Sequence, residues 1–402
     1  MKKIDVPSIV LLGLLLSGVC FWLFGPIARR AQTAAAQTAS QDVRNSQDSS
    51  SMPMPPKAPR EFDFPYYSLR DGFESTMFLV NHSADALRLR IAIHGLDGEA
   101  ADSKASIQPG QRLALSVRHL LDKQGQDAGG PFGEGNISIR YKGSMMAVVG
   151  QMSVVNSALS LIHESEMTEN DPGMSDVPAA LNGLWWGLGA GQEANVYVSN
   201  TAARPVIADV FLDFLGMRHA SEALTFRGHE TKVLSIAALL NAMNLSPTQA
   251  PEGGITIIGR GAPALIAEGA VMDPATGFST TLHFLAPQVQ LASTLVASGV
   301  PIGKPTKDSP YAGAGNFIPH VIVRNLADSP QQVTISIEYP HKKSFVHYDL
   351  PSLELGARSV EDVSLEPSLD ELSLPLPFCS IRITYSGPPG SAVGEAASIE
   401  RQ

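Results

Sequence analysis

A short pattern that occurs three times constrains the fold of this 402-residue chain more than any other feature. An apolar-rich run ending in asparagine occupies residues 77–81 (MFLVN), 196–200 (VYVSN) and 321–325 (VIVRN). A polar turn and another strand-like run follow each copy. The three asparagines lie 119 and 125 residues apart, a period far longer than that of a solenoid unit. Each copy therefore has the size of a whole domain.

Further landmarks recur in the same order after each asparagine. A glycine turn follows at a distance of 29, 28 and 31 residues, at Gly110, Gly228 and Gly356. Alternating strand-like runs come next, at residues 137–141, 255–259 and 381–385. This agreement predicts an internal duplication. We expect the three glycines to share one turn conformation, with positive φ or a close backbone approach, and to bind no ligand.

Each copy is predicted to be an antiparallel β-sandwich of immunoglobulin-like type, because short strands with turns every 8 to 12 residues are typical of that architecture. A short helix is expected at residues 117–123 and at residues 236–244. Residues 159–163 and 280–284 indicate closing strands of the first two copies. The third copy ends without an equivalent, so this strand is either absent or replaced by residues 291–315.

The predicted fold class is all-β, with three tandem sandwich domains, each with a short helical crossover, behind an N-terminal transmembrane helix. The predicted ranges are 1–30 for the membrane anchor, 31–60 for a disordered linker rich in Pro, Ser and Gln, 61–168 for the first sandwich, 178–288 for the second and 291–402 for the third.

The anchor is predicted from an uncharged apolar run at residues 9–25, which has about the length that a bilayer requires. A cleaved secretory signal and a lipoprotein anchor at Cys20 are the alternatives. Arg29 and Arg30 stand before any small-residue cleavage site, and bulky residues surround Cys20, so an uncleaved anchor fits better. We expect a single-pass protein of the inner (cytoplasmic) membrane, with its C-terminal domains in the periplasm or outside the cell.

Composition excludes some classes of partner and site. A formal charge of −10 and a pI near 5.5 argue against a nucleic-acid binder, which needs a basic surface. Cys20 and Cys379 are the only cysteines of the chain. One lies in the apolar N-terminal run and the other in the third copy, so we expect neither a disulfide between them nor a thiolate metal site.

The sequence indicates no catalytic, cofactor-binding or metal-binding residues. His163 and His283 lie near equivalent closing strands without companion ligands. Trp185 and Trp186 are the candidate partner-binding residues, because neighbours on a strand face opposite sides. One of them is expected in the core and the other is expected to face outward. The outward ring is either covered by the adjacent domain or linker, which is the commoner case, or exposed to bind a partner or a glycan.

Tandem sandwich units without disulfides, behind an N-terminal anchor and a Pro/Ser-rich stalk, resemble bacterial membrane-anchored envelope proteins with Ig-like repeats. The resemblance covers residues 61–402 as an architecture and implies no catalytic residue.

The first hypothesis is a membrane-tethered, non-enzymatic protein that presents three sandwich modules for adhesion, scaffolding or envelope assembly. Its expected partners are the membrane and other envelope proteins or surface glycans. The alternative is a glycan-binding protein or an enzyme, with a site near Trp185 and Trp186 or in an inter-domain cleft.

Overall fold

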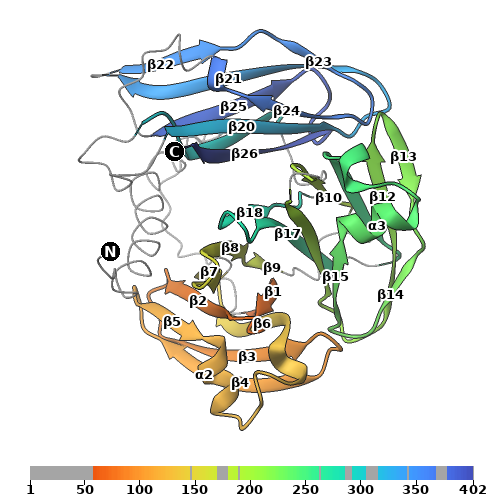
Figure 1. Ribbon diagram of the computed structural model, residues 1–402. Coiled ribbons are helices and arrows are strands. Elements are labelled where there is room, and N and C mark those ends of the chain that lie inside the picture. Colours follow the sequence, from red (N-terminus) through yellow and green to blue (C-terminus); the bar gives the residue numbers. More distant parts are fainter. Residues whose placement is uncertain are drawn as a thin grey trace, which may run out of the picture.

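The computed structural model describes residues 58–144, 147–169, 180–188, 191–261, 264–285, 292–304, 316–341, 344–367 and 378–401. The predicted anchor at residues 9–25 and the alternatives to it lie outside these ranges. Within them, no helix has the length and hydropathy that a membrane span requires. The structure is built from antiparallel β-sheets and short helices, as the all-β prediction requires (Figure 1).

The first repeat begins at Ala58, slightly before the end of the predicted linker. Its elements are β1 (Ala58–Ser68), β2 (Phe73–Asn81), β3 (Leu87–Gly95), β4 (Ala100–Ile107), β5 (Arg112–Ser116), α2 (Val117–Asp122), η1 (Pro131–Gly133), β6 (Glu134–Gly143), β7 (Val148–Asn156), β8 (Leu161–Glu166) and β9 (Thr168–Glu169). They form a five-stranded sheet of order β4-β3-β6-β1-β9 and a smaller sheet of order β5-β2-β7-β8.

The second repeat has the same strand order, except that β9 has no counterpart among its described residues. Its elements are β10 (Ala180–Trp185), β11 (Glu193–Asn200), β12 (Val206–Phe214), β13 (Met217–Ala220), β14 (Leu224–Phe226), β15 (Thr231–Ser235), α3 (Ile236–Ala242), η2 (Pro247–Gln249), β16 (Gly253–Gly259), β17 (Leu265–Asp273) and β18 (Phe278–Leu282). The larger sheet has the order β10-β16-β12-β13, with β14 also on β12, and the smaller sheet has the order β15-β11-β17-β18.

The third repeat lacks one strand of this pattern among the described residues. Its elements are β19 (Thr294–Pro301), β20 (Asn316–Asn325), β21 (Gln331–His341), β22 (Ser344–Asp349), β23 (Leu353–Leu355), β24 (Val360–Ser364), β25 (Phe378–Tyr385) and β26 (Ala392–Arg401). The larger sheet has the order β19-β25-β21-β22, with β23 on β21, and the smaller is β24-β20-β26. β19 thus takes the place of β1 and β10 and does not replace a closing strand.

The three repeat asparagines occupy one structural position. Each ends the second strand of its repeat and is fully buried. In each, the side-chain amide donates to the carbonyl oxygen four residues later, and its Oδ1 accepts from the backbone N–H two residues later. The amide also donates across the turn, to Ile107, Arg227 and Gly356. A buried side chain with these partners closes the turn after the strand, which explains why the pattern recurs.

The three glycines of the predicted turn do not share a conformation, and that expectation is wrong. Gly110 has a φ of +68°, but the positive φ in the matching turns belongs to His229 (58°) and Arg358 (54°). Glycine is needed at position 228 for a different reason, the close approach of the backbone: a Cβ there would lie 2.2 Å from the carbonyl oxygen of Ala203. Gly228 and Gly356 therefore lie one and two residues before the positions that match Gly110 in the structure.

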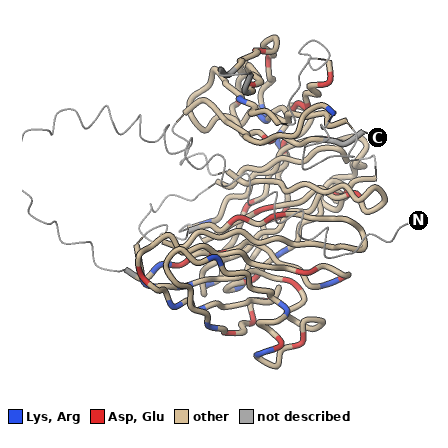
Figure 2. The backbone as a smooth tube through the Cα atoms, turned by 90° about the vertical axis from the view of Figure 1, so that its left-hand side faces the viewer, with Lys and Arg blue, Asp and Glu red and all other residues tan. Residues whose placement is uncertain are grey.

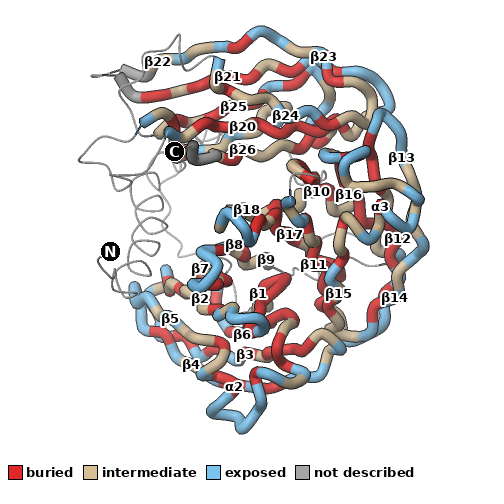
Figure 3. The backbone as a smooth tube through the Cα atoms, in the orientation of Figure 1, coloured by how far each residue is buried: buried red, intermediate tan, exposed pale blue. Residues whose placement is uncertain are grey.

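Each pair of sheets encloses a buried apolar core (Figure 3). Figure 1 shows the three pairs following an arc, with the second repeat between the other two. The core of the second repeat continues into the third through Ile322, Val360 and Ala397. Lys and Arg are interspersed with Asp and Glu along the chain (Figure 2).

The contact between the first and second repeats and the contact between the second and third use corresponding surfaces. Ser199, directly before Asn200, donates from its hydroxyl to the carbonyl oxygen of Pro65 in β1, 2.6 Å away. Arg324, directly before Asn325, donates to the carbonyl oxygen of Gly183 in β10, also at 2.6 Å. β1 and β10 are the corresponding first strands. Alternation places both donors on the outer face of their strand, because the neighbours on either side face the core.

Candidate functional site: a pocket between the first two repeats

Trp185 and Trp186 are both buried, with 0% and 2% of their surface exposed. The expectation that one of them faces outward is wrong. Trp185 ends β10 and donates to the carbonyl oxygen of Ala250 at 3.3 Å. Trp186 follows the strand and meets Phe278 edge-on. Gly187, with a φ of +75°, turns the chain here, so strand alternation does not continue to Trp186. Neither ring offers a surface for a partner.

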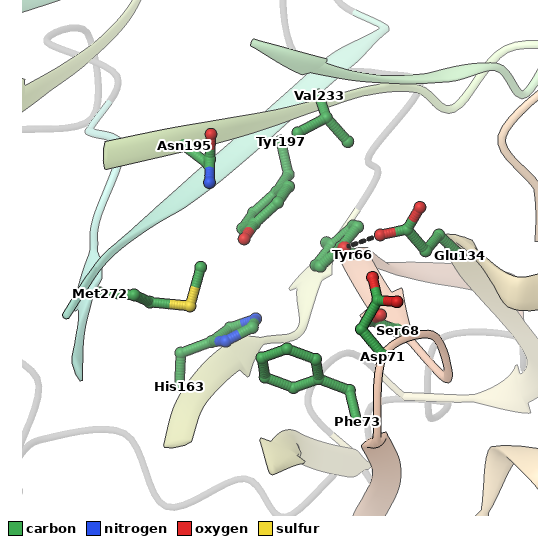
Figure 4. Close-up of a pocket in the computed structure, with 10 residues that line it drawn as sticks. All are labelled: Tyr66, Ser68, Asp71, Phe73, Glu134, His163, Asn195, Tyr197, Val233 and Met272. Carbon is green, nitrogen blue, oxygen red and sulfur yellow. Dashed lines mark hydrogen bonds between the residues drawn. The ribbon is translucent and has the colours of Figure 1, made fainter. Parts of the chain in front are cut away.

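A pocket of about 180 Å³ lies instead where the first repeat meets the second (Figure 4). It is lined by Tyr66 and Ser68 of β1, Asp71 of the turn before β2, Phe73 at the start of β2, Glu134 of β6, His163 of β8, Asn195 and Tyr197 of β11, Val233 of β15 and Met272 of β17. None of these residues was a candidate in the sequence, apart from His163 as an isolated histidine.

A β-bulge places Tyr66 in the pocket. The pairing of β1 with β6 shifts register between Phe64 and Tyr67, so Pro65 and Tyr66 together lie opposite one residue of β6. A bulge changes the direction of the side chains that follow it. Tyr67 can therefore enter the core of the first repeat while Tyr66 points to the second.

Tyr66 and Tyr197 form the wall between the repeats. Their rings are parallel within 3°, with centroids 3.6 Å apart. The Tyr66 hydroxyl donates to Oε1 of Glu134 at 2.6 Å. Burial is the main cause that raises the pKa of both phenols. Tyr197 and the Glu134 carboxylate raise the pKa of Tyr66 further, and nearby carboxylates, with Glu268 first, raise the pKa of Tyr197. Both hydroxyl groups therefore remain protonated and give the pocket a fixed polar side.

His163 stacks beside this pair, with its ring centroid 5.7 Å from that of Tyr197. Only 3% of its surface is exposed, and neither ring nitrogen has a hydrogen-bond partner. Burial lowers the pKa of His163 to about 4, so the imidazole is neutral at pH 7 and presents one donor and one acceptor nitrogen. Buried polar atoms are normally paired, and an unpaired one calls for an explanation.

The remaining polar groups of the pocket include two carboxylates and one amide. Glu134 keeps Oε2 at 3.7 Å from Nε of Arg70, an ion pair at the rim. Asp71 is exposed at the mouth, in a left-handed conformation with a φ of +52°. Asn195 adds a side-chain amide. Two carboxylates and a neutral imidazole between aromatic rings can accept several N–H or O–H donors.

Other features of the described residues do not add a second site. In the described ranges, no three His, Cys, Asp or Glu side chains come together as metal ligands. Cys379 is buried in the third repeat, where burial raises the pKa of its thiol to about 12. A thiol of this kind is a poor nucleophile at neutral pH.

Comparison of the chain with protein-family models and with curated proteins found no match in either. The sequence contains one signal for this pocket, the Tyr66-Tyr67 pair. Neighbouring residues of a regular strand face opposite sides, so one of the two rings must point away from the core of the first repeat. What the sequence lacks is the partner, because Tyr197 comes from another repeat.

Proposed function

We propose that this chain is a non-enzymatic, membrane-tethered protein of the cell envelope, with an N-terminal helix in the cytoplasmic membrane. Three β-sandwich domains, one per repeat, act outside the cytoplasm in adhesion, scaffolding or envelope assembly. Among these roles scaffolding is favoured. A scaffold must hold its binding faces at fixed positions, and this requires domains that are not free to move against one another.

The observation that carries the proposal is the fully buried Arg324 between the second and third repeats. Its guanidinium donates to the carbonyl oxygens of Gly183 and Ile255 at 2.6 and 2.7 Å, and to the Thr256 hydroxyl at 2.7 Å. It also pairs with Asp213. A charge buried with this many directional partners permits one arrangement of the two repeats and penalises others.

The contact between the first and second repeats is also polar and directional. Hydroxyls of Ser279 and Thr281 in β18 accept from the backbone N–H groups of Ile162 and Glu164 in β8, and donate to their carbonyl oxygens. These bonds cover the edge of β8, which would otherwise be open to pairing with other chains. Both junctions therefore support a rigid arrangement.

The tether and the scaffold are tested separately on the full-length chain. Fractionation should find it in the membrane, and removal of residues 9–25 should release it. Cross-linking in intact cells, followed by mass spectrometry, should recover envelope proteins bound at the surface of the arc. Arg324→Met should change the recovered set if relative domain position matters. Recovery of the same proteins with the same yield would contradict a scaffolding role.

The glycan-binding or enzymatic alternative loses its site at Trp185 and Trp186, because both are buried. Its other expected place, a cleft between domains, coincides with the pocket around Tyr66 and His163. Ligand binding at that pocket is compatible with the scaffold.

A further inference from the structure

We infer that the pocket around Tyr66 and His163 is a binding site for a guanidinium or ammonium cation. The inference does not depend on the membrane tether or on the scaffold. It rests on three properties of the pocket: an excess of acceptors, aromatic walls and a small volume.

The excess of acceptors, two of them carboxylates, favours a positively charged ligand that donates hydrogen bonds. Glu134 and Asp71 carry negative charge, and Asn195 offers an amide oxygen. His163, buried and without a partner for either ring nitrogen, supplies a further acceptor pointing into the space. Guanidinium has five N–H donors and no acceptor, and ammonium has three donors and no acceptor. A carboxylate or a phosphate would meet repulsion from the carboxylates of Glu134 and Asp71.

The aromatic walls favour a cation over a neutral donor. Figure 4 shows the rings of Phe73, His163, Tyr66 and Tyr197 around the space, with the carboxylates of Glu134 and Asp71 on the Tyr66 side. Cations are attracted to the faces of phenol and phenyl rings, and a planar guanidinium also stacks on them. Arg70 already lies at the rim with its guanidinium near Glu134, so it is the group with which an incoming cation would compete.

The volume limits the ligand to one side-chain head or a small amine. About 180 Å³ is below the roughly 300–1,000 Å³ of sites that enclose drug-sized ligands. The pocket opens at Asp71 and at Val233, which is 42% exposed. An arginine side chain presented by a partner protein and a free guanidino compound have the same chemistry here, and the experiment distinguishes them.

The test is isothermal titration calorimetry on the full-length chain in detergent. Agmatine serves as the free cation and Nα-acetyl-L-arginine methylamide as the side chain in a peptide context. Nα-acetyl-L-citrulline methylamide, the neutral counterpart, is the control ligand. We expect one site per chain for at least one cationic probe, no measurable binding of the citrulline probe, and weaker binding as salt is raised. Binding of agmatine alone indicates a small-molecule site, and binding of the capped arginine indicates a partner side chain.

Asp71→Asn removes one charge without disturbing the fold, because Asn tolerates the left-handed conformation of this exposed position. It should weaken binding of the cationic probe about tenfold or more, since a hydrogen bond to a charged group is lost. Asp122→Asn, on an exposed position of α2, makes the same charge change away from the pocket and should leave binding unchanged. Absence of heat with both cations, equal binding of the citrulline probe, or equal affinity of Asp71→Asn would each overturn the inference.

Discussion

Arg324 of β20 and Asp213 of β12 form an ion pair in which both side chains are fully buried, and this pair joins the third repeat to the second. Arg218 contacts the same carboxylate from the half-exposed side, at 2.8 and 2.9 Å. Burial of Asp213 opposes its ionisation, but the two guanidinium groups hold its pKa below the usual value. Gly254 makes the pair possible, since a Cβ there would lie 2.0 Å from Nε of Arg324.

Replacing Arg324 by Met should destabilise the protein strongly. The change leaves two backbone carbonyls and the Thr256 hydroxyl buried without their donor, and Asp213 loses one of its two cations. Breaking a buried pair in this way costs about 3–5 kcal/mol. Urea unfolding, followed by tryptophan fluorescence, should show a lower midpoint. Arg260→Met is the matched control, because Arg260 pairs with Asp209 in solvent, and its midpoint should stay near that of the parent.

Gly98 and Gly110 allow two reasons for the presence of glycine, positive φ and lack of space for a Cβ, to be tested separately. Both have positive φ, at +87° and +68°, but a Cβ on Gly110 meets nothing within 4 Å. A Cβ on Gly98 would lie 2.1 Å from the carbonyl oxygen of Gly228 in the second repeat. Gly110→Ala should therefore cost about 1 kcal/mol, the strain of the left-handed conformation. Gly98→Ala should cost clearly more in the same urea titration. Equal losses of stability for the two variants would mean that the backbone of the second repeat moves away from a Cβ at position 98 without a measurable free-energy penalty.

How far the sequence predicts this structure depends on the range of the interaction. The repeat asparagines and the helices α2 and α3 were predicted because their signals are local: a buried amide closing a turn, and a short apolar run after Ser116 or Ser235, which cap the helices. The pocket was not predicted. It requires a bulge at Tyr66 and the ring of Tyr197, from a strand about 130 residues away. The periodicity of the sequence does not predict a contact between these two rings.

The glycine and tryptophan expectations failed for a related reason. Glycine marks turns well, but the left-handed residue of the second and third copies is His229 or Arg358, which the structure tolerates at a cost. Strand periodicity predicts opposite faces for Trp185 and Trp186. The strand ends at Trp185, and beyond a strand end periodicity predicts nothing about burial.

The protein should lose stability on mild acidification, in part through His163. Burial lowers its pKa to about 4, whereas an exposed histidine has a pKa of about 6.5. The unfolded chain therefore takes up this proton first, so stability is present above pH 6.5 and is lost as pH falls toward 4, by up to about 3 kcal/mol. Urea midpoints measured across this range should fall less steeply for His163→Phe. His119→Phe, at an exposed position of α2, should keep the slope of the parent. Equal slopes for all three proteins would exclude His163 as a cause.

The stacked rings of Tyr66 and Tyr197 should contribute a measurable coupling between the first two repeats. Offset-stacked or edge-to-face aromatic pairs add about 0.5–1.5 kcal/mol beyond the area they bury. With centroids 3.6 Å apart and parallel planes, these rings lie closer to face to face, so we expect a coupling at the lower end of that range. A double-mutant cycle with Tyr66→Leu and Tyr197→Leu isolates this energy, because each single change removes the same ring contact. Phe62→Leu combined with Tyr197→Leu is the control cycle. Phe62 stacks on Tyr141 inside the first repeat, so its effect and that of Tyr197 should add. A coupling near zero in both cycles would show that the rings meet without holding the repeats together, and the junction would then depend on the hydroxyl bonds of β18 and on Ser199.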